Sequence, residues 1–127
     1  LHKKSISLAA SSFALTEIIV VLLKIIVRRT RPFEALGLKT LSFLINNTYT
    51  TWNLSFPSSH SALVFAALPF FKGKIKYYWL AFALLVSFSR VFFSLHYLSD
   101  VIAGAIIGFA VSTIVIKIFK PGKSFIK

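Results

Sequence analysis

The chain has 127 residues, of which 57% are hydrophobic and three are acidic, and its mean hydropathy is +0.81, so it is too apolar for an ordinary water-soluble domain. The formal charge of +12 would suggest nucleic acid in a soluble protein, but here most of the cations follow membrane topology, so the expected partner is a bilayer and not nucleic acid. The sequence holds no cysteine, which excludes a disulfide framework, thiolate catalysis and a cysteine-ligated metal.

Four apolar segments, taken in chain order, predict an all-α integral-membrane bundle with four transmembrane helices. The first covers residues 5–27, and its helix is expected to end at Arg31-Pro32, because proline disfavours helical geometry in the residue before it. Residues 33–57 are more polar and predict an outside loop at the membrane interface. Within that loop, residues 38–45 suit one short interfacial helix.

The second apolar segment, residues 58–71, would rise only about 21 Å as a helix. It must therefore be buried among the other helices, extended at its start, or set low in the membrane. Proline and serine at residues 57–59 favour a helix start there. The third segment covers residues 77–95 and the fourth residues 97–116, where Gly104 and Gly108 permit close helix contact.

The cations predict the orientation of the bundle. If the helices alternate in direction, one side holds nine of the fifteen: Lys3, Lys4, Lys72, Lys74, Lys76, Lys117, Lys120, Lys123 and Lys127. By the positive-inside rule this side is cytoplasmic, so the arginines at positions 28, 29, 31 and 90 lie outside and need another explanation. We expect a bacterial inner-membrane protein. Because the chain begins with Leu1, residues 1–127 are expected to form a single domain that lacks upstream helices.

Two groups of polar residues are expected at the outer end of this bundle. Lys24 and Arg31 are seven residues apart, close to two helical turns, so both would point from one face of the first helix. Alternatively, these cations only anchor a helix end in anionic headgroups. At the start of the second helix, Ser58, Ser59 and His60 combine free backbone N–H groups with a histidine suited to proton transfer. A serine cap followed by an interfacial histidine would give the same sequence.

A third group follows the third helix and contains a histidine, a carboxylate and a cation. His96 and Asp100 are four residues apart, so their side chains are expected to be neighbours across the opening turn of the fourth helix. Asp100 can then accept the Nδ1 proton of His96 and leave the other ring nitrogen free to attack an electrophile. An aspartate is also a favourable charge at a helix start. With Arg90 nearby, the convergence of cations suits a phosphoryl group.

These residues resemble the three-part signature of the type 2 phosphatidic acid phosphatase superfamily in order and in internal spacing. The signature positions are Lys24 and, after six residues, Arg31-Pro32; then Pro57-Ser58-Ser59-His60; then Ser89-Arg90, five residues, His96, three residues and Asp100. The resemblance implies that the four helices are the last four of a six-helix fold. The family usually has glycine where this chain has Ser59, which weakens any inference about the substrate.

The resemblance also implies a role for each residue. His96 would be the nucleophile that forms a phosphohistidine, Asp100 would orient it, and His60 would protonate the leaving group. The phosphoryl oxygens would be held by Lys24, Arg31, Arg90, Ser58 and Ser59. No metal and no cofactor are implied.

The expected function is hydrolysis of a phosphorylated membrane lipid on the outer, periplasmic face. Candidate substrates are a polyprenyl diphosphate, phosphatidylglycerophosphate, phosphatidate and lipid A phosphate, and the sequence does not choose among them. One alternative is a lipid phosphotransferase that uses the same phosphohistidine. A second, of a different class, is a non-catalytic membrane protein whose cations bind anionic headgroups. The sequence does not indicate an oligomeric state.

Overall fold

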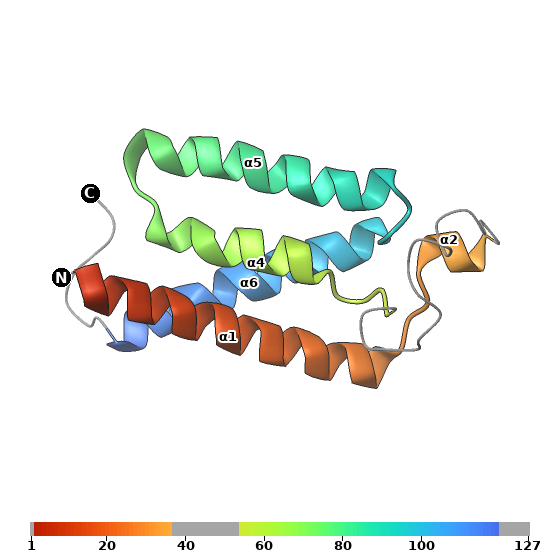
Figure 1. Cartoon of the computed structure of the whole chain (residues 1–127), viewed down its shortest axis with the longest axis horizontal. Coiled ribbons are helices and arrows are strands. Elements are labelled where there is room, and N and C mark those ends of the chain that lie inside the picture. Colours follow the sequence, from red (N-terminus) through yellow and green to blue (C-terminus); the bar gives the residue numbers. More distant parts are fainter. Residues whose placement is uncertain (1, 37–53, 120–127) are drawn as a thin grey trace.

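The computed structural model describes residues 2–36 and 54–119, and the elements in these two ranges are all helical. In chain order they are α1 (His2–Val27), α2 (Pro32–Ala35), α4 (Ser59–Ala67), the 3₁₀ helix η2 (Leu68–Phe70), α5 (Gly73–Phe92) and α6 (Leu98–Phe119). Figure 1 shows the longer helices side by side in one bundle. The predicted all-α class is confirmed for the described part of the chain, whereas the short helix predicted over residues 38–45 lies outside it.

Three of the helices are long and apolar enough to cross a membrane. The candidate spans are Ser5–Ala35, Gly73–Phe92 and Leu98–Phe119. Within the described residues, three of the four predicted spans thus correspond to candidate spans, and the count of four is not confirmed. The remaining apolar helix, α4 with η2, covers Ser59–Phe70, and its nine α-helical residues rise only about 14 Å.

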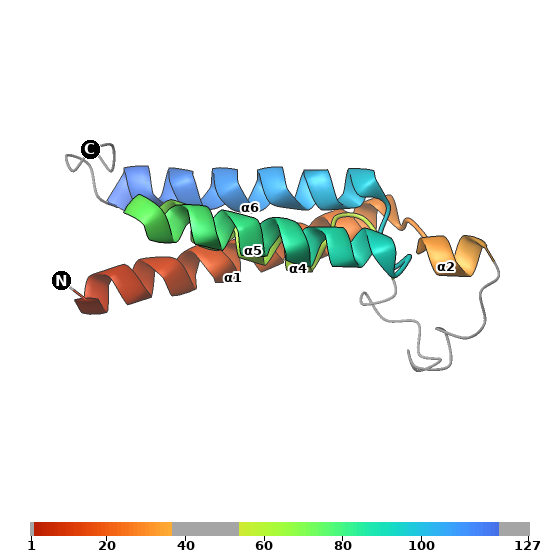
Figure 2. The ribbon, with the colours of Figure 1, turned by 90° about the horizontal axis from the view of Figure 1, so that it is seen from above.

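The short helix α4 lies in the centre of the bundle, which is the first of the three arrangements that its length left open. It packs against α6, α1 and α5, and Ala62 and Ala66 are fully buried. Figure 1 shows α4 between α1 and α5, and Figure 2, turned by 90°, shows α6 along one side of α5. α6 also packs against α1. A helix too short to span the bilayer is accommodated because its neighbours cover it.

Two glycines of α6 allow its backbone to approach α4, which confirms the predicted close contact. A Cβ atom added at Gly104 would overlap the carbonyl oxygen of Ser58 and lie 3.2 Å from the backbone nitrogen of Ala62. One added at Gly108 would lie 2.7 Å from the carbonyl carbon of Ala62. Only glycine fits at either position, because each space is bounded by backbone atoms that cannot rotate away.

The first helix ends earlier than the sequence predicted. α1 stops at Val27, and Arg28 adopts a left-handed conformation with φ of 51°. Arg31 is extended, at φ −74° and ψ 151°, because Pro32 follows it and opens α2. The expectation that Lys24 and Arg31 share one helical face is therefore wrong.

The short α2 attaches this segment to the turn between α5 and α6. Phe33 is 2% exposed, and its backbone N–H donates to the carbonyl oxygen of Ser94 at 3.1 Å. This contact brings Arg31 to the end of the bundle where α1 and α5 end and α4 and α6 begin. We call this end the polar end.

Candidate active site

His96 lies at the polar end, in the turn that joins α5 to α6. The backbone N–H groups of Leu95 and His96 both donate to the carbonyl oxygen of Arg90, at 3.0 and 3.2 Å. The His96 side chain is nearly buried, at 3% exposure. The residue is thus held by its own turn and stands just before the first turn of α6.

The nearest partner of the His96 ring is the backbone of Ser55, not the carboxylate of Asp100. His96 Nδ1 lies 2.7 Å from the carbonyl oxygen of Ser55 and 3.7 Å from Asp100 Oδ2. Because a carbonyl oxygen only accepts hydrogen bonds, Nδ1 carries the proton. In the neutral ring the lone pair is then on Nε2, which is the tautomer expected from the sequence, reached through a different acceptor.

Asp100 is fully buried and its carboxylate is occupied by other donors. Arg29 Nη1 donates to Oδ1 at 2.9 Å, the backbone N–H of Tyr97 donates to Oδ2 at 2.8 Å, and the hydroxyl of Ser55 also donates to Oδ2. The contact with Tyr97 caps the start of α6. These partners explain why the carboxylate stands back from the His96 ring.

The start of α4 carries the expected serines and histidine. Ser58 is buried and is the N-cap residue, and its Oγ accepts the backbone N–H of Ser61 at 3.4 Å. The backbone N–H of Ser58 donates to the carbonyl oxygen of Asp100 at 3.0 Å, which ties α4 to α6. Ser59 is half-buried and His60 is exposed. Their N–H groups open the helix and have no partner within it, so they can bind an anion.

Lys24 joins α1 to the segment before α4. Its side chain is 4% exposed, and Nζ donates to the carbonyl oxygens of Leu54 at 2.9 Å and Pro57 at 2.8 Å. An ammonium group has three hydrogens, so these two bonds leave one for a ligand. Lys24 therefore positions residues 54–58 and keeps one donor for an anion.

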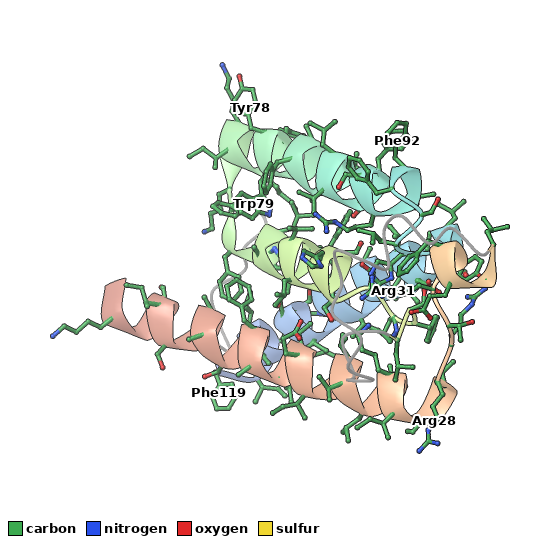
Figure 3. All side chains as sticks on the ribbon, turned by 45° about the vertical axis from the view of Figure 1, so that its right-hand side comes forward. Arg28, Arg31, Tyr78, Trp79, Phe92 and Phe119 are labelled. Atoms are coloured by element: carbon green, nitrogen blue, oxygen red, sulfur yellow. The ribbon has the colours of Figure 1, made fainter. Side chains whose placement is uncertain are left out.

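The two signature arginines approach the same end from different elements. Arg31 Nη1 donates to the carbonyl oxygen of Leu95 at 3.2 Å, next to His96 in the chain. Arg90 is in the last turn of α5, and its Nε is buried without a hydrogen-bond partner among the described residues. In Figure 3, Arg31 lies among the side chains of the polar end, whereas Arg28 points away from the bundle.

The two histidines share a positively charged environment. Burial first, and then Arg31 and Lys24, lower the pKa of His96 to about 4, against smaller opposing effects of its bond to Ser55 and of Asp100. The pKa of His60 is also lowered, first by partial burial and then by Arg90, Arg31 and Lys24. Both imidazoles therefore feel Arg31 and Lys24, and both are neutral at pH 7 in the free protein.

Sequence reasoning missed two residues of this cluster, Ser55 and Arg29. Arg29 was counted only among the cations outside the membrane. The signal that could have found it is Asp100, because a carboxylate at the start of a membrane helix needs a cation nearby. Ser55 gave no signal, because its contact with His96 uses the backbone carbonyl. Among the described residues, no group of three or more histidine and acidic side chains could hold a metal ion.

The fold and this cluster define an all-helical membrane protein with a cation-rich site at one end. The model of the PAP2 superfamily matches residues 6–123, and the chain belongs to that superfamily. Membership supports a phosphatase-type function on lipid phosphates in general. This match to the family model confirms the resemblance drawn from the signature residues. No curated protein and no solved structure shows a significant match.

Proposed function

We propose that this protein hydrolyses the phosphate or diphosphate monoester of a membrane lipid through a phosphohistidine on His96. The observation that supports it best is the hydrogen bond from His96 Nδ1 to the Ser55 carbonyl at 2.7 Å. It fixes the tautomer whose Nε2 lone pair is available at neutral pH. The lowered pKa of His96 keeps that lone pair unprotonated well below pH 7.

In the first step, His96 Nε2 attacks the terminal phosphorus, and the bond from this phosphorus to the leaving oxygen breaks. The departing oxygen takes a proton from His60, which leaves a lipid alcohol, or a lipid monophosphate if the substrate is a diphosphate and the bridging oxygen departs. In the second step, water attacks the phosphohistidine and gives a proton back to His60. The second step frees inorganic phosphate and restores His96.

The cations would hold the phosphoryl oxygens and stabilise the charge that spreads over them in the transition state. Lys24 has one hydrogen left for this purpose, and the buried Nε of Arg90 gains a partner when a phosphoryl oxygen accepts from it. Arg31 adds a fixed positive charge. The hydroxyl of Ser58 and the N–H groups of Ser59 and His60 would complete the binding of the phosphoryl group.

The acid role of His60 requires a proton that its lowered pKa disfavours in the free protein. A bound phosphate resolves this conflict, because its negative charge offsets Arg90, Arg31 and Lys24 and attracts a proton to the imidazole. Binding of the substrate would therefore favour protonation of His60, which can then act as the general acid. The exposed position of His60 allows that proton to come from solvent.

The substrate is proposed to be a lipid of the outer leaflet, and the membrane is proposed to be a bacterial inner membrane with the site on its periplasmic face. Polyprenyl diphosphate, phosphatidylglycerophosphate, phosphatidate and lipid A phosphate all present a terminal phosphoryl group to such a site. Ser59, where the family usually has glycine, adds a hydroxyl near the leaving group and is a candidate for setting the preference among them.

The test compares wild type with His96→Asn on a panel of these lipids in native-like membranes. Asparagine can keep the donor to the Ser55 carbonyl, because its amide nitrogen takes the place of Nδ1, but it has no nucleophile. We expect a folded variant without phosphate release. If His96→Asn hydrolyses lipid phosphate as fast as wild type, the catalytic assignment is wrong. If labelled phosphate passes to another lipid instead of to water, the enzyme is a phosphotransferase.

A further inference from the structure

We propose that Arg29 and Ser55, which are not among the defining positions of the three-part signature, are positioning residues that hold His96 and the carboxylate of Asp100 in their relative positions. This inference rests on the proposed role of His96. It predicts that Ser55 links the carboxylate of Asp100 to the His96 ring, and that Arg29 holds this carboxylate in place. Neither residue needs to touch the substrate.

Ser55 connects three parts of the chain that are distant in sequence. It is fully buried, its carbonyl oxygen accepts from His96 Nδ1 at 2.7 Å, and its hydroxyl donates to Asp100 Oδ2. Its backbone N–H donates to the carbonyl oxygen of Arg29 at 2.7 Å. Any shift of Ser55 therefore moves the acceptor of the His96 proton and a donor of the carboxylate together.

Arg29 fixes the other oxygen of the carboxylate. Its Nη1 bonds Asp100 Oδ1 at 2.9 Å and Ser99 Oγ at 2.7 Å, and its guanidinium carbon lies 4.0 Å from the centre of the Tyr97 ring. The arginine side chain is 37% exposed while that of Asp100 is fully buried. A buried carboxylate without a cation would be costly, so the contact with Arg29 offsets the burial of Asp100.

These contacts matter for the reaction because the His96 ring becomes positively charged when Nε2 bonds to phosphorus while Nδ1 keeps its proton. The Ser55 carbonyl then accepts a charge-assisted hydrogen bond, and the carboxylate, 3.7 Å from Nδ1, stabilises the ring electrostatically. Both effects grow as the bond to phosphorus forms. Loss of either should lower kcat more than it raises KM.

The first experiment compares Arg29→Gln with Arg28→Gln in the full chain in native-like membranes. Arg28 is the matched control: it lies at the same helix end, and its Nε donates only to the carbonyl oxygen of Ile25 in the described structure. We expect kcat of Arg29→Gln to fall by about 10-fold to 100-fold with little change in KM, and Arg29→Lys to recover part of the loss. Arg28→Gln should keep the wild-type values.

The pH profile separates positioning from a purely structural role. The charged groups that act on His96 are Lys24 and Arg31 from the α1 side and Asp100 from α6. Without Arg29, the unpaired carboxylate of Asp100 attracts a proton to the ring more strongly. The acid limb of kcat should therefore move to higher pH in Arg29→Gln and stay in place in Arg28→Gln.

The second experiment uses Ser55→Ala, which removes the hydroxyl but keeps the carbonyl that binds His96, and Ser55→Thr, which restores a hydroxyl. We expect a lower kcat in the first and recovery in the second, with Ser112→Ala as a control at a fully buried serine in the middle of α6. The proposal is wrong if Arg29→Gln and Ser55→Ala match wild type in kcat and pH profile while His96→Asn is inactive. It is also wrong if their losses only follow loss of folded protein and the pH profile does not move. An active His96→Asn variant would instead refute the proposed function itself.

Discussion

Gly108 offers a direct test of how the helices position the site. In Gly108→Ala the new Cβ would lie 2.7 Å from the carbonyl carbon of Ala62, about 0.8 Å closer than the ~3.5 Å at which carbon atoms pack. The backbone of Ala62 cannot rotate away as a side chain could, so α4 must move by on the order of 1 Å. Overpacking of this kind costs about 1–3 kcal/mol. Because α4 has only nine residues and carries His60 in its first turn, the shift reaches the polar end.

The assay combines thermal unfolding with phosphate release from a lipid phosphate. We expect Tm to fall and kcat/KM to fall by about 100-fold, because a misplacement of about 1 Å between reacting groups can cost that much. Ala110→Val is the matched control, since it adds two carbon atoms to an exposed position of the same helix and should change neither quantity. Wild-type Tm and activity in Gly108→Ala would show that the close backbone contact between α4 and α6 is not present in the membrane.

Three further predictions concern Lys24, His96 and the anion site. Lys24→Met leaves the buried carbonyl oxygen of Pro57 and the part-buried carbonyl oxygen of Leu54 without this donor. The loss costs about 1–3 kcal/mol for the buried group and less for the other, so Tm and kcat should fall together. An unchanged Tm would limit Lys24 to binding the substrate. Because the pKa of His96 drops from 6.5 to about 4 on folding, the unfolded chain takes up a proton between these values that the folded chain refuses. Stability should then decrease by about 2 kcal/mol from pH 7 to pH 5, and this decrease should be smaller in His96→Asn, as measured by denaturation at each pH. Vanadate should inhibit competitively, because side-chain cations bind the proposed transition state. For the same reason EDTA should not inhibit, and a loss of activity on chelation would reveal a metal.

The segments of the sequence that form the long helices could be predicted, because hydropathy and segment length are local properties of the sequence. The apolar segments marked α1, α5 and α6. The shortness of the second segment left three arrangements open, and the fold shows that α4 is buried among the other helices. The end of α1 was not predictable to the same degree. The proline rule applies only to Arg31, whereas α1 ends at Val27 and is followed by the left-handed residue Arg28, which no local pattern marks.

The candidate site was predictable only as far as side-chain chemistry marks it. Lys24, His60, His96 and Asp100 stand out in an apolar sequence because each is costly in a membrane unless it is used. The partner of His96 Nδ1 could not be found in this way. It is a backbone carbonyl, which every residue possesses, and only the fold determines that Ser55 supplies it.

The contacts around residues 54–58 explain how so short a helix can contribute to a precise site. Lys24 binds the carbonyl groups of Leu54 and Pro57, and Ser55 binds both Asp100 and His96. α4 is thus held from its N-terminal side as well as by its packing, so the start of the helix, where we propose that the anion binds, keeps its distance from His96. If Lys24 binds the phosphate as proposed, the same cation fixes this segment and couples substrate binding to the integrity of the site. Substitution of Lys24 should therefore lower activity even where another cation could replace its charge.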